Sequence, residues 1–525
     1  MEIKNKKLKA SALAYALIIM AIVMIILTSM LGYITSQIKF SANRAQKEEA
    51  FQIAEAGIYF YRWYLAHQTA GKTAREVDDF WQGSSPLGVD SPYQKTFSDP
   101  EGGVIGSYSI EAERPMSGST IVVVKSTGWT NKEPNLKRTV RVRFRRPSWS
   151  EYAVLANDFM RFGQGTEVFG KIHSNKGIRF DGLAHNIVSS LMTTFDDPDH
   201  SGGNEFGVHT HVNTPPTTGV NNNYRPLEAP PNPVQTRSDV FAIGREFPVS
   251  EVSFAGVSSD LAFMRTQAQS GSGRYFNNSG CGRTISLTNG TFNICTVNSY
   301  NSDSYSISDY QGIVTGATGG YSGSNGTSCT TSACCLYSDC GWISSSRHSR
   351  GKCVSMANYD IPNNGIIFVD DNAWVEGTIN DKKVTIVATY NSVIGDNSCS
   401  TNTSRDIYIG MNNLLYTNFD GRDVIGLIAQ NNISVVANSL NNLTIDGALL
   451  AQSGRVGRNH YSSSYDKSTI TVNGSMATNI RYGFAYTDGT GYDNRILNFD
   501  NNLLYYPPPY FPTGSQYSID LWEEI

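Results

Sequence analysis

The beginning of the chain has the strongest hydrophobic pattern, an apolar run that carries no charge. Ala10–Ile38 contains no Asp, Glu, Lys or Arg, and Lys4, Lys6, Lys7 and Lys9 precede it. As a helix rising about 1.5 Å per residue, this run can cross a bilayer core of about 30 Å. Because basic residues mark the cytoplasmic side of a span, we expect a cytoplasmic tail and export of everything after residue 40.

The helical pattern continues past the apolar run. Apolar residues then recur at spacings of three and four, at Phe51, Ala54, Ile58, Tyr61 and Leu65. This spacing places them on one face of a helix, so we expect one nearly continuous helix to about residue 68. A cleaved secretory signal has an apolar region of only about 7–15 residues and fits less well. A plain single-span anchor with an amphipathic extension is the other alternative.

The run KKLKASALAYALIIMAIVMIILTSMLGYITSQIKF, with EEAFQIAEAGIYFY after it, resembles the N-terminus of type IV pilin-like proteins. The resemblance is strongest to the PilX N-terminal family and covers about residues 5–68, with Ala54–Gly57 as the family's AEAG-like stretch. It implies a basic leader, residues 1–10, that a prepilin peptidase removes between Ala10 and Ser11. It also implies that residues 11–68 form the helix that assembles with other pilin-like subunits in the membrane.

One departure from this family affects the expected role. Most pilins have glutamate at the fifth mature position, where this chain has Tyr15. In pilins the glutamate pairs with the N-terminal amine of a neighbouring subunit, and K-type pseudopilins at filament tips also lack it. The resemblance therefore implies a minor pilin or pseudopilin and leaves open whether the leader is cut.

The segments after the helix predict a linker and a small sheet. Residues 69–103 are rich in Gly, Ser and Pro, and residues 104–147 hold three strand-like runs separated by turns, typical of an antiparallel sheet. Basic side chains alternate with apolar ones in the last run, at Arg138, Arg141, Arg143, Arg145 and Arg146. We interpret them as the solvated face of an edge strand and not as a basic binding patch.

Residues 148–506 predict a β-solenoid-like domain, which makes the fold class α+β overall. Short β-branched runs recur at 165–182, 364–389, 405–437, 443–454 and 468–477 without long helices between them. A β-sandwich is the alternative. Asn pairs separate the runs, at Asn363–Asn364, Asn412–Asn413, Asn431–Asn432, Asn441–Asn442 and Asn501–Asn502. We expect these pairs to adopt left-handed corners and to stack as amide ladders.

Two further segments complete the predicted domain. A Cys-containing insertion occupies about residues 190–363, and the Pro- and aromatic-rich residues 507–525 form a strap over the last rung. All eight cysteines of the chain are disulfide candidates: Cys281, Cys295, Cys329, Cys334, Cys335, Cys340, Cys353 and Cys399. An even number in an exported region favours disulfides, although the pairing is not determined. The absence of any CxxC pair argues against a metal knot.

One segment is dense in potential metal ligands. They are Asp196, Asp197, Asp199, His200, Glu205, His209 and His211. A site for Ca²⁺ or another divalent ion would place His209 and His211 on one side of a strand. The composition is equally that of an ordinary polar loop, which is the interpretation we adopt. We therefore predict no metal and no cofactor.

The sequence shows no sign of catalysis. It lacks GxSxG, HExxH and P-loop motifs. Asp370 and Asp371, with Glu376 nearby, could act as a carboxylate pair on a β-helix. Adjacent strand residues point to opposite faces, however, so a turn before Trp374 explains them better. We predict that the protein is not an enzyme and has no catalytic residues.

These observations together predict a minor pilin or pseudopilin-like subunit of a type IV pilus or type II secretion-like filament. It would be a single-pass protein of the cytoplasmic membrane that displays a large extracellular β-domain for assembly, surface contact or adhesion. Tyr and Asn on the β-domain favour a glycan or cell-surface protein as partner, while a net charge of −4 argues against nucleic acid. The alternative is a membrane-anchored β-helix adhesin or polysaccharide-active enzyme without a filament.

Overall fold

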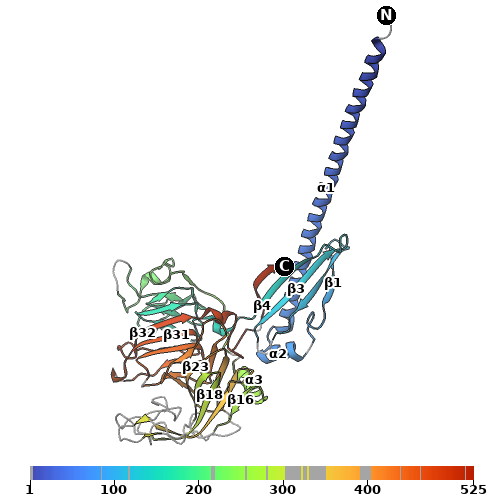
Figure 1. Cartoon of the computed structure of the whole chain (residues 1–525). Helices are drawn as coiled ribbons and strands as arrows, with labels where there is room; N and C mark the ends of the chain where they lie inside the picture. Colours follow the sequence, from blue (N-terminus) through green and yellow to red (C-terminus); the bar gives the residue numbers. More distant parts are fainter. Residues whose placement is uncertain are drawn as a thin grey trace.

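The computed structural model in Figure 1 describes most of the chain. The described residues are 4–83, 85–115, 119–214, 219–254, 257–278, 282–301, 321–322, 328–329, 350–390, 404–437, 439–461, 463–514 and 516–525. Only the backbone is described for residues 4–11, 74, 257–259, 297–301, 321–322, 328–329 and 350–356. The described residues form a long helix, a small head and a strand-rich domain (Figure 1).

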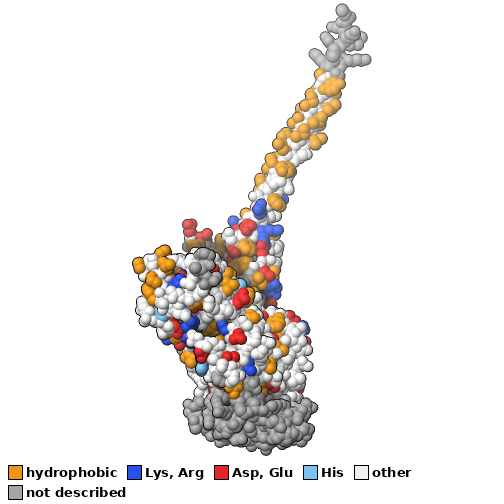
Figure 2. All heavy atoms as spheres, turned by 90° about the vertical axis from the view of Figure 1, so that its left-hand side faces the viewer, with side chains coloured by type: hydrophobic (Ala, Val, Ile, Leu, Met, Phe, Trp, Pro, Cys, Tyr) orange, Lys and Arg blue, Asp and Glu red, His pale blue; other side chains and the backbone are white. Residues whose placement is uncertain are grey.

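Helix α1 (Lys4–Thr69) is continuous over 66 residues and has two differently packed parts. Its N-terminal part projects away from the rest of the molecule, and apolar side chains cover it (Figure 2). Leu17, Ile22 and Leu31 are 59%, 50% and 63% exposed. Within the described residues, the helix from Ala12 onward is the one segment long and apolar enough to cross a membrane.

The C-terminal part of α1 packs against an antiparallel head sheet. The fully buried hydrophobic residues of this part are Ala50, Ile53, Ala54, Ile58, Tyr61 and Leu65. The predicted continuous helix and its apolar face are therefore confirmed. Glycines allow close contact here: a Cβ added to Gly128 would lie 2.3 Å from Ala50 O and 2.4 Å from Ala54 N, and one added to Gly57 would lie 2.2 Å from Ser126 Oγ.

The head sheet has five strands in the order β1-β2-β3-β4-β33. These are β1 (Tyr93–Ser98), β2 (Val104–Ala112), β3 (Ile121–Thr130), β4 (Arg138–Arg145) and β33 (Ser518–Glu524). The predicted linker 69–103 is wrong in part, because it contains helix α2 (Ala74–Gly83) and strand β1. Helix α2 has its own apolar face, on which Val77 and Trp81 are buried in the head core.

Strand β33 changes the interpretation of the basic strand. It pairs antiparallel with β4, so β4 is not an edge strand, and its arginines are only partly exposed. Acidic residues of the C-terminal segment meet these arginines: Arg141 Nε lies 2.8 Å from Glu523, and Arg138 pairs with Glu524. The edge-strand interpretation is therefore wrong, and the sequence did not show it because the partner strand is distant in the chain.

The strands of the β-domain fall in two stretches of sequence. The first holds β5 (Val154–Ala156), β6 (Met160–Phe162), β7 (Thr166–Phe169), β8 (Ile172–Ser174), β9 (Ile178–Phe180), β10 (Leu183–Ala184), β11 (Val188–Ser190), β12 (Thr194–Phe195), β13 (Glu205–Phe206), β14 (Val208–His209) and β15 (Arg245–Glu246). The second follows helix α3 (Val257–Gln269) and holds β16 (Arg274–Phe276), β17 (Gly282–Asn289), β18 (Thr291–Asn301), β19 (Tyr321–Ser322), β20 (Ser328–Cys329), β21 (Arg350–Asp360), β22 (Ile366–Val369), β23 (Ala373–Ile379), β24 (Lys383–Ala388), β25 (Ile407–Ile409), β26 (Leu414–Tyr416), β27 (Val424–Ala429), β28 (Ile433–Val435), β29 (Asn442–Ala451), β30 (Val456–Arg458), β31 (Lys467–Thr478) and β32 (Tyr492–Phe499).

Most of these strands pair in parallel as rungs of a stack, which favours the solenoid over the sandwich. One face runs in the order β16-β22-β24-β27-β29-β31-β5-β8-β11-β15. The chain thus enters at β5, inside the stack, and extends to one end at β15. After α3 it resumes at the opposite end and winds back to β31. The expected single insertion at 190–363 is therefore wrong, because β15, β16 and β17 are rungs of the stack.

The register of the stack aligns aliphatic side chains into a continuous core column. Fully buried residues at matching positions are Ile367, Ile386, Leu427, Leu449, Met476, Val154, Ile172 and Val188. The opposite side of the same face is covered by α3 and by Tyr510 and Phe511 of the C-terminal segment. The predicted strap therefore covers a sheet face and then joins the head, and it does not protect the last rung.

Asparagines stabilise the rungs, but not through the expected backbone conformation. Among the described residues, the non-glycine residues with positive φ are Asn289, Asp381 and Tyr510, so the predicted Asn pairs do not adopt left-handed corners. Their side chains instead accept hydrogen bonds from the next rung, as Asn432 does from Arg455 N at 2.9 Å.

Candidate metal centre

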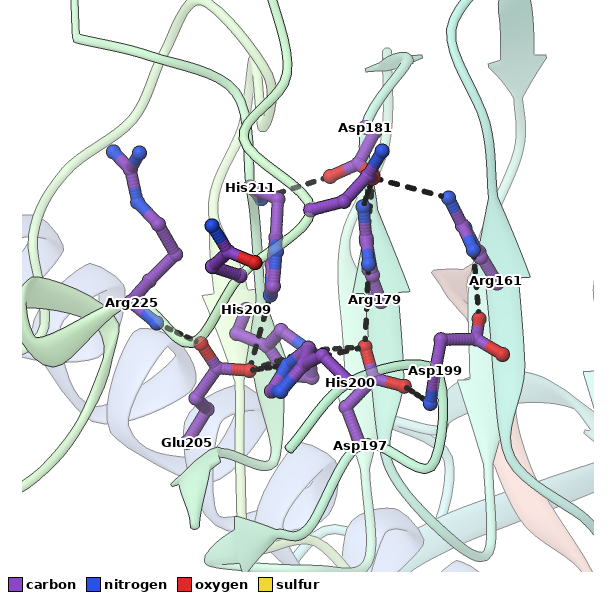
Figure 3. A network of polar contacts seen from close by, with 12 residues as sticks. Arg161, Arg179, Asp181, Asp197, Asp199, His200, Glu205, His209, His211 and Arg225 are labelled. Atoms are coloured by element: carbon purple, nitrogen blue, oxygen red, sulfur yellow. Dashed lines mark hydrogen bonds and ion pairs between the residues drawn. The ribbon is translucent and has the colours of Figure 1, made fainter. Parts of the chain in front are cut away.

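Four short strands, β9, β12, β13 and β14, assemble a buried polar cluster at one side of the stack. Strand β14 pairs in parallel with β9, which sets His209 opposite Arg179, and β13 pairs with β12. This arrangement brings together one potential ligand atom from each of Asp197, Glu205, His209 and His211 (Figure 3). The four atoms all lie within 4.8 Å of one another, and all four residues are buried. We call these four residues the ligand cluster.

The atoms of the ligand cluster converge on one carboxylate oxygen. Glu205 Oε2 lies 3.1 Å from His211 Nε2 and 3.3 Å from His209 Nε2. His209 Nε2 is also 3.6 Å from Asp197 Oδ2. His200 is a third imidazole at the same place, with its Nε2 3.1 Å from Glu205 Oε2.

Backbone hydrogen bonds hold the outer atom of every residue of the ligand cluster. Phe206 O is 2.9 Å from His209 Nδ1, and Asn221 O is 2.7 Å from His211 Nδ1. The carboxylates are fixed in the same way: Asp199 N donates to Asp197 Oδ1 at 2.9 Å, and Arg225 N donates to Glu205 Oε1 at 2.7 Å. Each side chain therefore has one anchored atom and one atom that points into the centre.

Charge around the cluster keeps its carboxylates ionised. Burial alone would raise the pKa of Asp197, but contacts with His209, the Asp199 amide and Arg179 lower that pKa overall. Burial likewise opposes ionisation of Glu205, and the pKa of Glu205 is nevertheless lowered by His211, His209 and the Arg225 amide. Two anionic carboxylates thus share one dry site.

Arg179 borders the site and pairs with two carboxylates, Asp181 and Asp197. Its side chain is 2% exposed and its Nε donates to Asp181 at 2.7 Å, while its Nη1 lies 3.6 Å from Asp197 Oδ2. Asp181 in turn accepts a hydrogen bond from His211 N at 2.8 Å, which connects the two rungs.

The interpretation of residues 196–211 as an ordinary polar loop is wrong for most of the seven residues. Asp196 is exposed, and Asp199 pairs outside the centre with Arg161 and Arg481. The remaining five residues meet as described above. Sequence reasoning missed Arg179 and Asp181, because only the pairing of β9 with β14 brings them close to the cluster.

The other candidate carboxylates have structural partners. Asp370 and Asp371 lie at the bend between β22 and β23, as the turn interpretation expects. Arg265, Tyr275 and Thr389 bond to Asp370, the tyrosine hydroxyl at 2.6 Å. Asp371 lies 3.5 Å from the buried Arg405.

Most residues named in the processing and cysteine predictions have no described side chain. Ala10 and Ser11 are part of α1, but only their backbone is described. Cys295 forms a disulfide. Its side chain is the only cysteine side chain among the described ones, so the pairing remains a prediction.

Comparisons with known proteins do not identify a family for this chain. No protein-family profile matches the chain, and no curated protein matches it. A crystal structure of the competence-associated pilin ComZ from Thermus thermophilus aligns with 91% of this chain and 98% of that chain, at 11% identity and a TM-score of 0.27. A TM-score of this size does not establish a shared fold.

Proposed function

We propose that this protein is a pilin-like, membrane-anchored subunit that displays its β-domain outside the cell. The two-part packing of α1 is the observation that carries the proposal. Its N-terminal part leaves large apolar side chains exposed, whereas its C-terminal part is the core of the head. An apolar surface of this kind is stable only in a bilayer or among similar helices.

The position of the β-domain supports a minor role in a filament. It leaves the head after β4 and returns to it at β33, so it is attached to the head at two points. A domain of this size would obstruct regular tiling of a shaft, which favours a place at the tip or occasional places along the side. The missing glutamate, replaced by Tyr15, favours the same place. In this proposal the Lys-rich N-terminus is cytoplasmic.

The first experiment is membrane fractionation with matched variants. Ile22→Asp places a charge in the span, which costs about 2.5–3.5 kcal/mol for insertion, and Ile22→Leu is the control. We expect a smaller share of the aspartate variant than of the leucine variant in the membrane fraction. Equal membrane retention of both variants would contradict the proposed anchor.

The mass of the N-terminus separates a pilin from a plain anchor. A chain that begins at Ser11 supports processing by a prepilin peptidase. A start at Met1 favours the anchor without a filament, and a start beyond about residue 36 rejects the pilin assignment, because a secretory signal would then have been removed.

For the β-domain we propose binding without turnover, to a glycan or a cell-surface protein. The support is that Asp370, Asp371 and Glu376 are buried and make contacts within the fold. The test is incubation of the full chain in detergent with surface polysaccharides. Retention without cleavage is expected. New reducing ends or unsaturated sugars, abolished by Asp370→Asn, would overturn the non-enzyme assignment.

A further inference from the structure

The hydrogen bonds of the two cluster histidines determine which ring nitrogens can bind a cation. A carbonyl oxygen only accepts, so the Nδ1 atoms of His209 and His211 must carry the protons in their contacts with Phe206 O and Asn221 O. In the neutral rings, each Nε2 therefore holds a lone pair. Both lone pairs face Glu205 Oε2, which is itself an acceptor.

Two atoms of the ligand cluster also lack conventional partners. Among the described residues, His209 Nε2 and Asp197 Oδ2 have no hydrogen-bond partner. The His209 side chain is 0% exposed and the Asp197 side chain 2% exposed, so bulk solvent does not reach these atoms. Buried polar atoms without a partner are rare and costly, and here both point into the same centre.

The charge of the site calls for two positive charges. Arg179 pairs with both Asp181 and Asp197 and offsets one of the three negative charges of Asp181, Asp197 and Glu205, which leaves a charge of −2 if the histidines are neutral. A divalent cation at the centre would neutralise both carboxylates and bind both lone pairs. Protonation of two histidines is the competing solution, and it requires two imidazolium rings buried side by side, with centroids 5.5 Å apart.

The spacing of the atoms fits a small tetrahedral ion. A tetrahedral ion bound at about 2.0–2.2 Å keeps its ligand atoms about 3.3–3.6 Å apart. Three of the six distances among the ligand atoms of Asp197, Glu205, His209 and His211 are 3.1, 3.3 and 3.6 Å, and all six are within 4.8 Å, so a small closing movement would complete the site. Imidazole donors favour zinc and related transition metals, whereas Ca²⁺ requires six to eight oxygen ligands.

We propose that Asp197 Oδ2, Glu205 Oε2, His209 Nε2 and His211 Nε2 bind one divalent transition-metal ion of the zinc class. The four backbone hydrogen bonds to the outer atoms orient these ligands before the metal arrives. With four protein ligands and no exposed face, the site is structural and not catalytic. It joins distant parts of the segment from Asp197 to His211 to one another, while the pairing of β14 with β9 holds that segment on the stack. This proposal is independent of the proposed pilin role.

The test measures metal content in the full chain, purified in detergent and supplied with Zn²⁺ or Co²⁺. We expect about one tightly bound ion per chain and the visible d–d absorption of tetrahedral Co²⁺. His209→Gln and His211→Gln should each weaken zinc binding at least about 10-fold. His460→Gln is the matched control, because His460 is exposed and its partners Asp488 and Tyr486 lie outside the ligand cluster.

Two readouts keep the test valid if a variant misfolds. The Co²⁺ spectrum of the unsubstituted chain does not depend on any variant, and circular dichroism checks each variant's fold. A chelator should lower the melting temperature of the unsubstituted chain and of His460→Gln. Absence of bound metal and of the Co²⁺ bands, with no effect of the chelator, would overturn the proposal and assign the cluster to protonated histidines.

Discussion

Arg143 Nε donates to Asp520 Oδ1 at 3.0 Å, although the two residues are 377 positions apart in the chain. Arg143 belongs to β4 and Asp520 to β33, so this ion pair spans the point where the chain returns from the β-domain to the head. Asp520 also lies 3.7 Å from Arg145 Nε. Strand β33 is thus held against β4 in two ways. Its backbone pairs with that of β4, and its acidic side chains form ion pairs with the arginines of β4.

Reversal of the Asp520 charge should detach β33 from the head. In Asp520→Lys, a lysine would face Arg143 and Arg145, and we expect the free energy of unfolding of the head to fall by about 1–3 kcal/mol. Limited proteolysis should then release the C-terminal segment faster. The exchange Arg143→Asp with Asp520→Arg should recover part of the loss. Asp493→Lys, at an exposed aspartate, is the control. Equal proteolysis of all variants would contradict this role.

Gly128 should tolerate no side chain. A Cβ there would meet the backbone of Ala50 and Ala54, which cannot move without displacing α1. We expect Gly128→Ala to lower the free energy of unfolding by about 1–3 kcal/mol, the usual cost of overpacking. Thermal melts measure the effect. Gly163→Ala, where an added Cβ has no atom within 4 Å, should change stability little. If both variants melt alike, the close contact is not required.

Asp446 should make the β-domain less stable as pH rises. Asn473 Nδ2 donates to Asp446 at 2.8 Å, and Asn498 donates to Asn473 at 2.8 Å, so the three residues form a ladder across rungs. Burial raises the pKa of Asp446, an effect that hydrogen bonds from Asn473 and Tyr416 offset only in part. A carboxyl with a raised folded pKa favours folding below about pH 4 and loses this contribution as pH rises through the folded value.

Asp446→Asn should remove this pH dependence. An amide can keep the ladder if the amides reverse direction, so the variant should gain melting temperature relative to the unsubstituted chain between about pH 4 and 7. Melts at constant ionic strength measure the difference. Asp446→Ala should instead cost about 1–3 kcal/mol, because Tyr416 N would lose its acceptor. Parallel pH curves for the asparagine variant and the unsubstituted chain would contradict the prediction.

The cysteines provide a test of export. Cys295 is already in a disulfide, and an oxidising compartment would pair most of the other seven. Titration of the denatured, unreduced chain should find no more than about two free thiols. Six or more free thiols would indicate a reducing compartment and would contradict the proposed topology.

Local pattern predicted much of this fold, and distant pairing explains what it missed. The apolar face of α1 and the parallel rungs follow from spacing that is visible within about twenty residues. The pairing of β4 with β33 has no local signal, because Arg143 and Asp520 are far apart in sequence. The entry of the chain at β5, inside the stack, is equally invisible, since each rung has the same local pattern whichever neighbour it pairs with.

The sequence indicated the ligand residues of the candidate metal centre, but not the backbone contacts that orient them. Asp197, Glu205, His209 and His211 stand out by their density, but density alone does not distinguish a loop from a buried site. The outer hydrogen bonds to Phe206 O and Asn221 O, which orient the rings, depend on backbone geometry. The sequence around Arg179 predicts only a strand, and its place beside the cluster follows from the pairing of Arg179 with His209 between β9 and β14.

The return of the chain at β33 also determines the order in which the molecule can be completed. During synthesis, β1–β4 are made first, and the strand that closes their sheet follows only after the whole β-domain. Until then β4 keeps an unpaired edge, which is a site for incorrect strand pairing and aggregation. The head, whose core includes the C-terminal part of α1, therefore reaches its final form only after the ribosome has finished the β-domain.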